Sequence, residues 1–486
     1  MINWRVISKT SGMLLIVEVL LLLASMGSAL FYHEDVMPFV WAILACAAVG
    51  GAGIYYGRHE SRMVGRKDSY IIVSAIWILF SVLGMIPYLV AQTFHDVAGA
   101  FFETMSGFTS TGATALPNID DQPHSILFWR SLTQWIGGIG IIFFTVAFLP
   151  AVGQSEVKIF AAESTGPIHN KIQPRISVTA RWIASIYIML TISCAGLLYL
   201  LGMSLFDAIN FSLTTTATGG FAPHSAMLHE LYDSPAIEYV ITFFMFASGT
   251  NFTLLYWAIF KGQFSKIFQD HEFRCYLAIC FGAIIVATTI MYLHPHTPFN
   301  LELSFREAAF TVVSLQTTTG YASCDYMLWP SMVHPVLLIV MLAGSCSGST
   351  SGGMKCIRLS IINRILRNEF IHILHPRAIL PLKINGTIIP QSVRQTLLAF
   401  LSLFGVFCVT GTLALSFCGL NLEEAMSIAI STLSNVGPAL GRFGPTQCWD
   451  IISPTGKYVC SFLMLIGRLE IFPVVIIFTR SFWMKN

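Results

Sequence analysis

The chain has 486 residues, of which 55% are hydrophobic and only 11% are charged, and its mean hydropathy is +0.70. Soluble domains carry about 25% charged residues, and the apolar residues here form long runs along the whole chain, so the composition excludes an ordinary soluble protein. The formal net charge is only +2, but basic and acidic residues are distributed unequally among the segments that separate the apolar runs.

Ten apolar runs are long enough to cross the apolar core of a bilayer, which takes roughly 20 residues of helix. Helices rather than strands are expected, because a span in lipid must satisfy its own backbone hydrogen bonds. The first run is too long for a signal peptide and is followed by a second, so it is kept as a span. The predicted spans cover approximately 11–31, 38–57, 70–92, 127–149, 181–202, 236–260, 275–293, 332–356, 394–418 and 457–480.

Four shorter and more polar stretches lie between consecutive spans and are too short to cross the bilayer. They cover 97–114, 205–221, 302–321 and 421–438. The chain is therefore predicted to begin with two transmembrane helices and a cytoplasmic loop over 1–69. Four units of helix, pore loop and helix follow, over 70–149, 181–260, 275–356 and 394–480.

The distribution of basic residues predicts the orientation, because Lys and Arg accumulate in cytoplasmic loops. With a cytoplasmic N-terminus, the segments 58–69, 150–180, 261–274, 357–393 and the C-terminal tail are also cytoplasmic. Only four of the 27 basic residues then lie outside, namely Arg130, Arg306, Arg442 and Lys457. Both termini are predicted to be cytoplasmic. Most acidic residues face outward, which raises the local concentration of cations there.

The four polar stretches align on one glycine each, namely Gly112, Gly220, Gly320 and Gly437. Thirteen residues before the glycine stand Gly99, Asp207, Glu307 and Glu424, and the first repeat has Asp96 slightly earlier. Six residues before the glycine stands a hydroxyl in every case, namely Ser106, Thr214, Ser314 and Ser431. One such segment is typical of ordinary helix packing in membranes. Four in register indicate internal duplication.

Each stretch is predicted to form a short helix followed by an extended return segment. Thirteen residues of helix run about 20 Å, which reaches the middle of the membrane and no further. An acid early in the helix stabilises its N-terminus through the helix dipole. Non-helical backbone at mid-membrane depth is tolerated only where it is buried in protein or lines water. Four such turns around one axis would form a ring of carbonyls that replaces the hydration shell of a cation.

This pattern of four repeats with one glycine each resembles the Trk/Ktr/HKT superfamily of potassium transporters. The two extra N-terminal spans are similar to the TrkH-type membrane subunit of the Trk potassium uptake system rather than to KtrB. The resemblance covers essentially the whole chain and implies a pseudo-fourfold pore, a homodimer and a location in the bacterial inner (cytoplasmic) membrane. It also implies a cytoplasmic nucleotide-binding regulatory subunit of the TrkA type. Neither an organic cofactor nor a nucleic acid partner is expected.

The resemblance assigns a selectivity filter to the residues around each glycine, and glycine in all four repeats implies permeation by K⁺. The expected filter consists of Ser110, Thr111, Gly112, Thr218, Gly219, Gly220, Thr318, Thr319, Gly320, Asn435, Val436 and Gly437. Potassium is expected at Thr111, Gly112, Gly219, Gly220, Thr319, Gly320, Val436 and Gly437. The fourth repeat departs from the others because Asn435 and Val436 replace the threonine-rich approach, so a weaker contribution to the ring is expected from it.

A run of Gly, Ser, Thr and Cys over 344–353 interrupts the eighth span and should face the pore rather than lipid. The resemblance implies an intramembrane loop that closes the pore below the filter, with the gate residues Gly344, Ser345, Ser347, Gly348, Ser349, Gly352 and Gly353. A phosphate-binding loop is a poor match, because Met354 separates the glycine from Lys355 and no strand precedes the run.

Arg468 lies within the last span. A buried Arg costs roughly 2.5–3.5 kcal/mol on insertion scales and usually faces a cavity or a partner. Pairing with Glu470 is one interpretation, although residues two apart on a helix point in different directions. The other, which agrees with the family, is that Arg468 is a gate residue whose charge repels the permeating cation and helps to hold the pore shut.

Other functions fit the sequence less well. A membrane enzyme would need a nucleophile with a base, or metal ligands, at membrane depth, and neither is present in the sequence. A secondary cation transporter of another family also has broken helices, but such proteins usually show two halves rather than four quarters. A pore subunit of a Kdp-like pump shares the repeat but is coupled to an ATPase. The predicted function is therefore gated potassium uptake under control of a cytoplasmic subunit.

Overall fold

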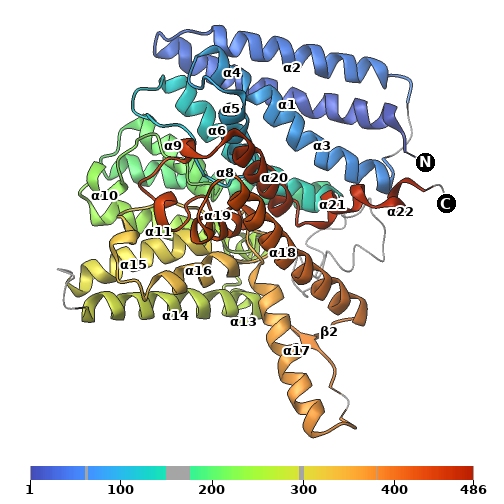
Figure 1. Cartoon of the computed structure of the whole chain (residues 1–486), viewed down its shortest axis with the longest axis vertical. Helices are drawn as coiled ribbons and strands as arrows, with labels where there is room; N and C mark the ends of the chain where they lie inside the picture. The colour runs from blue at the N-terminus through green and yellow to red at the C-terminus, as the bar shows by residue number, and fades with distance from the viewer. Residues whose placement is uncertain (1, 61–63, 149–175, 295–299, 379, 485–486) are drawn as a thin grey trace.

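The computed structural model describes residues 2–60, 64–148, 176–294, 300–378 and 380–484 (Figure 1). Within these ranges the chain is almost entirely helical. The only strands there are β1 (Lys383–Ile384) and β2 (Thr387–Ile388), which form an antiparallel hairpin with Lys383 opposite Ile388. The all-α architecture predicted from the sequence is therefore confirmed.

The two N-terminal helices, α1 (Trp4–Phe31) and α2 (Met37–Tyr56), form a hairpin along one edge of the molecule (Figure 1). The Asn3 side chain caps α1 by accepting hydrogen bonds from the backbone N–H groups of Arg5 and Val6. Glycines allow the two backbones to approach closely. A methyl group on Gly12 would lie 2.5 Å from the Gly50 carbonyl oxygen. Small residues at such crossings are typical of helix packing in membranes.

The rest of the chain forms four groups of helices, each with one short central helix. The first group contains α3 (Arg66–Gly84), α4 (Ile86–Val90), α5 (Val97–Phe108) and α6 (His124–Phe148). The second contains α8 (Ile176–Leu200), α9 (Leu205–Thr216), α10 (Leu228–Leu231), α11 (Pro235–Ser248), α12 (Phe252–Lys261) and α13 (Ser265–Gln269). The third contains α14 (His271–Leu293), α15 (Leu301–Gln316), η2 (Tyr326–Leu328), α16 (His334–Ala343) and α17 (Cys356–Leu374). The fourth contains α18 (Gln391–Phe417), α19 (Leu422–Ser434), η3 (Gly441–Phe443), η4 (Trp449–Ile451), α20 (Pro454–Arg468), α21 (Phe472–Val475), η5 (Ile476–Phe478) and α22 (Arg480–Trp483).

The short helices α5, α9, α15 and α19, called the pore helices below, are arranged in a closed cycle. Each pore helix packs against the long helix that precedes it within its own group. Each also packs against a helix from the second half of a neighbouring group, in the pairs α6 with α9, α11 with α15, α16 with α19 and α20 with α5. The last pair joins the fourth group back to the first. A cycle of equivalent contacts is the packing expected for four related units around one axis.

Among the described helices, six are long and apolar enough to cross a membrane, and eight if each strongly bent pair counts as one span. The remaining two predicted spans correspond to α6 and to α16. The helix α16 has only 10 residues and ends at Gly344, where the predicted interruption begins. The turn at Gly344 has φ +66°, a conformation that glycine adopts without steric cost.

Two spans that the sequence predicts as continuous are broken. The helices α11 and α12 meet at an angle of 106° across residues 249–251, and α20 and α21–η5 meet at 113°. At the first break the Asn251 side chain accepts a hydrogen bond from the Thr253 N–H and so starts a new helix. At the second, Glu470 and Ile471 have φ angles of +55° and +65°. Hydropathy cannot detect these breaks, because apolar residues continue on both sides of them.

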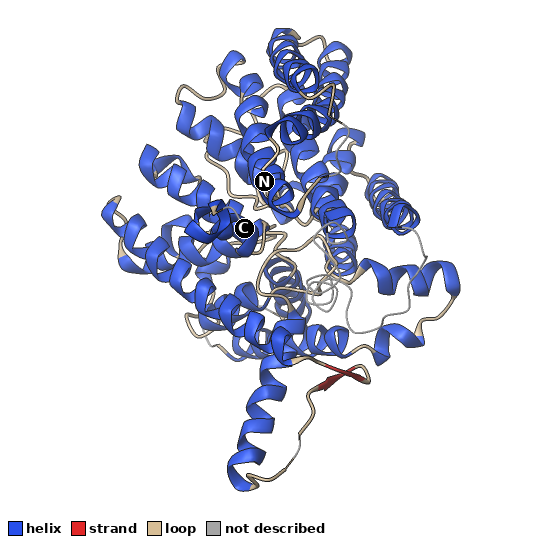
Figure 2. Ribbon diagram, turned by 90° about the vertical axis from the view of Figure 1, so that its right-hand side faces the viewer, coloured by secondary structure: helices blue, strands red, loops and turns tan. Residues whose placement is uncertain are grey.

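The buried apolar side chains form two large clusters. One joins the N-terminal hairpin with the first and fourth groups, and the other joins the second and third groups. Turned by 90° in Figure 2, the helices surround loop segments near the middle of the molecule. The helix α17 and the β-hairpin extend away from the body in both views.

The close α1–α2 crossing generates a test of the fold. Gly12→Leu should lower the midpoint of thermal unfolding, because the new side chain meets the Gly50 carbonyl and overpacking of this kind costs roughly 1–3 kcal/mol. Gly27→Leu in the same helix is the control, since no atom lies within 4 Å of a methyl group at Gly27. Tryptophan fluorescence of both purified variants during heating in detergent measures the difference. Equal midpoints of thermal unfolding for the two variants would contradict the close crossing of α1 and α2.

Candidate functional site

All four pore helices end in the same hydrogen-bonded turn. The N–H of the residue before each aligned glycine donates to the carbonyl of the hydroxyl-bearing residue six positions before the glycine. These bonds are Thr111 to Ser106 (2.9 Å), Gly219 to Thr214 (2.9 Å), Thr319 to Ser314 (2.8 Å) and Val436 to Ser431 (2.9 Å). A second bond, between residues three apart in sequence, closes each turn, for example from the Ser110 N–H to the Gly107 carbonyl at 2.9 Å. The pair of bonds is a Schellman motif, which ends a helix through a left-handed residue.

The left-handed residue of each turn stands two positions before the glycine. The φ angles are +51° at Ser110, +51° at Thr218, +57° at Thr318 and +55° at Asn435. Asparagine enters this region readily, but a β-branched threonine does so rarely, and such strain persists only where the surroundings enforce it. The fourth segment, whose sequence departs from the others, therefore has the same backbone conformation.

The aligned glycines themselves have φ angles of +85° at Gly112, +79° at Gly220, +81° at Gly320 and +104° at Gly437. A methyl group on any of them would overlap with a carbonyl oxygen of the neighbouring segment. The pairs are Gly112 with Gly219, Gly220 with Thr319, Gly320 with Val436 and Gly437 with Thr111. These contacts close a ring around the four segments. Glycine is required at each position by backbone angle and by space together.

The ring lies at the C-terminal ends of the pore helices, and the opposite ends of these helices carry polar caps. The capping residues are Asp96, Ser204, Asn300 and Asn421. A helix dipole places partial negative charge at the C-terminal end, which favours a cation there. Of the acids singled out in the sequence, Asp207 and Glu424 lie in the first turn of their helices. Glu307 lies deeper, because α15 begins four residues earlier relative to its glycine than the other pore helices.

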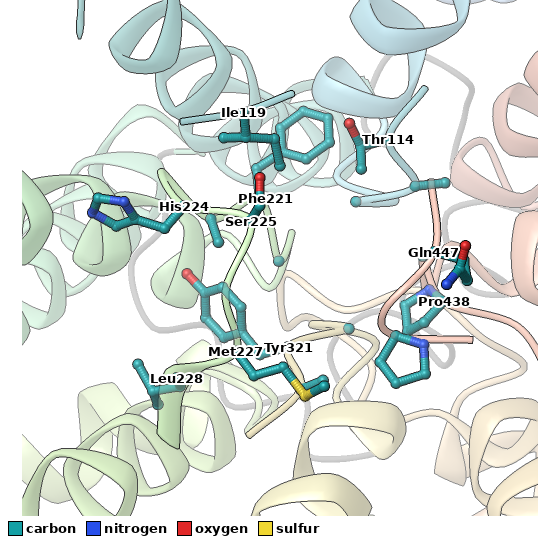
Figure 3. A pocket seen from close by; sticks show the side chains of 18 of the residues that line it. Thr114, Ile119, Phe221, His224, Ser225, Met227, Leu228, Tyr321, Pro438 and Gln447 are labelled. Carbon is teal, nitrogen blue, oxygen red and sulfur yellow. The ribbon is translucent and has the colours of Figure 1, made fainter. Parts of the chain in front are cut away.

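A cavity of about 130 Å³ lies against the ring and is lined by all four glycines. Its walls come from the segments that follow the glycines, including Phe221, Tyr321 and Pro438. Figure 3 shows these side chains around the cavity, with His224 at its far edge from Pro438 and Gln447. By the predicted orientation this is the outer side of the ring, and it is called the outer cavity below.

The predicted gate segment 344–353 lies against the other side of the ring. Its Thr350 hydroxyl donates to the Thr216 carbonyl at 3.1 Å, and the Thr218 hydroxyl donates to Thr350 at 3.2 Å. The Gly352 N–H donates to the Thr318 hydroxyl at 2.7 Å, and the Gly353 N–H donates to the Ser434 carbonyl at 2.9 Å. The segment therefore contacts the second, third and fourth repeats at or beside their left-handed residues.

Arg468 supplies the contact with the first repeat. Its guanidinium donates to the Ser110 hydroxyl at 3.3 Å, to the Gly137 carbonyl at 2.9 Å and to the Thr350 carbonyl at 2.8 Å. The side chain is buried, and all three acceptors are neutral. Glu470 instead pairs with Arg358, so the interpretation of Arg468 as the partner of Glu470 is wrong.

The remaining predicted gate residues all lie in this segment. Gly348 and Gly353 have φ angles of +71° and +74°, and the Gly348 carbonyl accepts from the Phe252 N–H at 3.0 Å, at the break between α11 and α12. The hydroxyls of Ser345, Ser349 and Ser351 hydrogen bond with one another.

Two residues that hold the site are not among the predicted site residues. The Gln134 amide donates to the Gly219 carbonyl at 2.7 Å and accepts from the Phe221 N–H at 3.0 Å. The buried Glu272 carboxylate accepts from the Ser347 hydroxyl at 2.8 Å and from the Ile357 N–H at 3.2 Å. Each is a polar residue inside or at the start of an apolar span, and that was the only signal available.

A buried ion pair fixes the wall of the outer cavity. Arg130 and Glu103 lie 2.9 Å apart, and both side chains are at most 1% exposed. Glu103 also accepts from the Ala115 N–H at 2.8 Å, and Arg130 donates to the Ala222 carbonyl at 3.1 Å. The pair thus joins the segments that follow Gly112 and Gly220.

The basic residues predicted to lie outside all have acidic partners in the structure. Besides Arg130, these are Arg306 with Glu238 and Glu302, Arg442 with Glu424, and Lys457 with Asp450 and Asp96. The predicted cytoplasmic segment 150–180 lies almost wholly outside the described residues.

Comparison with known proteins identifies relatives over the full length. The sequence pattern of the TrkH family, described as a cation transport protein, matches residues 36–484. The chain is 32% identical to the Trk system potassium uptake protein TrkH of Escherichia coli K12 over 485 residues, which cover 99% of both chains. It is 33% identical to the Trk system potassium uptake protein TrkG of the same organism, over 99% of this chain and 98% of that one.

A solved structure is also similar. The crystal structure of the potassium transporter TrkH from Vibrio parahaemolyticus matches with a TM-score of 0.89 and 33% identity, over 99% of this chain and all of that chain.

The buried pair beside the outer cavity yields a prediction for stability. Arg130→Met leaves the Glu103 carboxylate buried without its partner, which typically costs about 3–5 kcal/mol, so the thermal midpoint should fall strongly. Arg442→Met removes the related pair with Glu424, but the Arg442 side chain is 63% exposed, so only a small change is expected. Heating both variants in the same detergent compares them. Similar shifts would show that the Arg130 pair has no special role.

Proposed function

Because this chain belongs to the TrkH family of cation transport proteins, we propose that it takes up potassium ions through the ring formed by its four filter segments. The observation that carries the proposal is the fourfold turn of left-handed residue, intervening residue and glycine, closed into a ring by glycine-to-carbonyl contacts. Rings of backbone carbonyls replace the hydration shell of K⁺ in selective pores. The family membership argues against the two alternative functions, a secondary cation transporter of another family and a Kdp-like pump subunit.

The ions are expected to bind at Thr111, Gly112, Gly219, Gly220, Thr319, Gly320, Val436 and Gly437. The helix dipoles of the four pore helices support this assignment, because their negative ends meet at the ring. Most acidic residues lie on the predicted outer side, where they would raise the local concentration of cations at the entrance to the ring. The chain acts as a transporter rather than an enzyme, and K⁺ is its substrate rather than a cofactor.

The gate would consist of the segment 344–353 and Arg468, which together touch all four filter segments from the predicted inner side. The guanidinium of Arg468 hydrogen bonds only to neutral acceptors, and in a low-dielectric surrounding a positive charge at this position opposes a cation. Opening would require the segment to leave the ring. Inward movement of K⁺ gains about 2.3 kcal/mol per 100 mV of membrane potential.

The proposed setting is the bacterial inner membrane, with both termini in the cytoplasm. The positive-inside distribution of Lys and Arg supports this orientation. The Lys67 ammonium also donates to the Met484 carbonyl at 3.0 Å, which joins a predicted cytoplasmic loop to the C-terminal tail.

The proposed partners are a second copy of the chain and a cytoplasmic nucleotide-binding subunit of the TrkA type. The projecting helix α17 supports such assembly, because it extends from the body on the predicted cytoplasmic side. It carries Arg364 and Arg367, and the hairpin beside it carries Lys383.

The filter is tested by Gly320→Ser. A side chain at Gly320 meets the Val436 carbonyl, so K⁺ over Na⁺ selectivity should fall roughly tenfold for each 1.4 kcal/mol of lost ion stabilisation. Growth of a potassium-uptake-deficient strain on limiting potassium, together with Rb⁺ and Na⁺ uptake, measures the change. The control is Gly282→Ser, because no atom lies within 4 Å of a methyl group added at Gly282. Rescue by both variants with unaltered selectivity would overturn the filter assignment.

The gate is tested by Arg468→Ala, which should raise cation flux severalfold because the charge below the ring is gone. Arg468→Lys retains the charge and should keep the flux low, which separates charge from packing. Flux into proteoliposomes that contain equal amounts of inserted protein gives the comparison. An unchanged or abolished flux in a correctly inserted Arg468→Ala protein would count against the proposed gate.

A further inference from the structure

One histidine at the rim of the outer cavity is held between two carboxylates. His224 follows Gly220 by four residues and lines the outer cavity together with all four filter glycines (Figure 3). Its Nδ1 lies 3.1 Å from Asp120 Oδ1, and its Nε2 lies 3.0 Å from Asp207 Oδ1. Asp120 belongs to the segment that follows Gly112, and Asp207 lies in the first turn of α9. The imidazole ring therefore bridges two repeats at the entrance to the ring.

This arrangement favours the protonated state of the ring. Ionised carboxylates accept hydrogen bonds and donate none, and a neutral imidazole has a single N–H. The imidazolium donates to both carboxylates, whereas the neutral ring leaves one ring nitrogen lone pair against a carboxylate oxygen. The hydrogen bond to Asp207 is the largest influence and raises the pKa of His224, with Asp120 adding to the shift and partial burial opposing it. The ring is thus charged below this raised pKa and loses its charge as the external pH rises through it.

Both carboxylates that face His224 also accept hydrogen bonds from neutral groups. Asp207 also accepts from the Ser204 hydroxyl at 2.8 Å and from the Tyr232 hydroxyl at 2.5 Å. Asp120 accepts from the Ser225 N–H at 3.2 Å. Tyr32, which follows α1, faces Asp207 and has its pKa raised by burial and by nearby acids. Tyr32 and Tyr232 thus stay neutral across the range in which His224 titrates.

Among the described residues that line the outer cavity, the other cationic side chain does not compete for these acids. Arg130 lines the same cavity but is neutralised by Glu103 at 2.9 Å. The carboxylates of Asp120 and Asp207 therefore depend on His224 for compensation of their charge.

We infer that the charge of His224 sets the affinity of the outer mouth for entering cations. The protonated ring cancels one carboxylate charge at the rim, and loss of the proton leaves that charge to attract K⁺. The inference rests on the proposed uptake function and on the proposed orientation. A unit charge at roughly 10 Å in a water-like dielectric changes the local cation concentration about twofold. We therefore expect the KM for K⁺ to fall about twofold as the external pH rises through the pKa of His224.

The test measures Rb⁺ uptake by the full chain in cells, between about pH 6 and about pH 9, around the titration range of histidine. The wild type should show the twofold step in KM. His224→Gln should show the low, alkaline value at every pH, and His224→Arg should show the high, acidic value at every pH. His229→Gln is the matched control, because His229 pairs with Glu238 at 3.4 Å and does not line the outer cavity. This control should keep the wild-type step.

A pH step that persists in His224→Gln, or its absence in the wild type, would overturn the inference. If neither replacement at position 224 folds, the salt dependence of the KM step in the wild type still tests the inference. An electrostatic step must shrink when ionic strength is raised, because surface charges are screened over about 10 Å at 0.1 M salt, and an undiminished step would refute the mechanism. A wild type that takes up no Rb⁺ at any pH would instead refute the proposed uptake function.

Discussion

The structure depends on how the backbone can leave each pore helix inside the protein without losing its hydrogen bonds. Each pore helix solves this with a Schellman turn whose N–H groups bond back to the last helical turn, so the following residues keep their carbonyls available. The left-handed residue at the turn and the glycine two positions later redirect the chain. Because the glycine has no side chain, the neighbouring carbonyl packs directly against it. The ring is the sum of four such local solutions.

The region below the ring departs from fourfold symmetry. Among the described residues, the long insertion over residues 344–353 comes from the third repeat, and the Arg that donates to the filter and to this insertion comes from the fourth. The breaks between α11 and α12 and between α20 and α21 lie beside these two elements. The Cys346 N–H donates to the Gly249 carbonyl at 3.1 Å, at the bend between α11 and α12, and Arg468 is the last residue of α20 before the second bend. The pore helices and filter turns, called the upper layer below, are therefore repeated four times. The residues on the other side of the ring, called the lower layer below, differ between the repeats.

The sequence predicts the upper layer better than the lower one. Glycine spacing and hydroxyls recur in register, so the pore helices and the positions of the turns follow from the repeat itself. Even the fourth segment conforms, because asparagine favours the left-handed region that Thr218 and Thr318 enter under constraint. The break at 249–251 has only a short local signal, the capping Asn251, and the break at 469–471 has no signal comparable to the repeat.

The supporting residues were also beyond single-sequence reasoning. Gln134 and Glu272 act through backbone groups that are distant in sequence, and a lone polar residue in an apolar run does not say which backbone it binds. The pairing of Glu470 with Arg358 rather than Arg468 likewise reflects the bend that separates the two side chains.

The closure of the ring between its first and last segments has a consequence for biosynthesis. The Asn435 amide donates to the Thr111 hydroxyl across 324 residues, and α20 packs on α5. At roughly 5–20 residues per second, the ribosome needs on the order of 15–65 s to supply the partner of the first segment. During that interval the filter segment of an inserted first repeat lacks its contact with the fourth segment. During membrane insertion, the first three filter segments must therefore remain without the fourth until it has been synthesised.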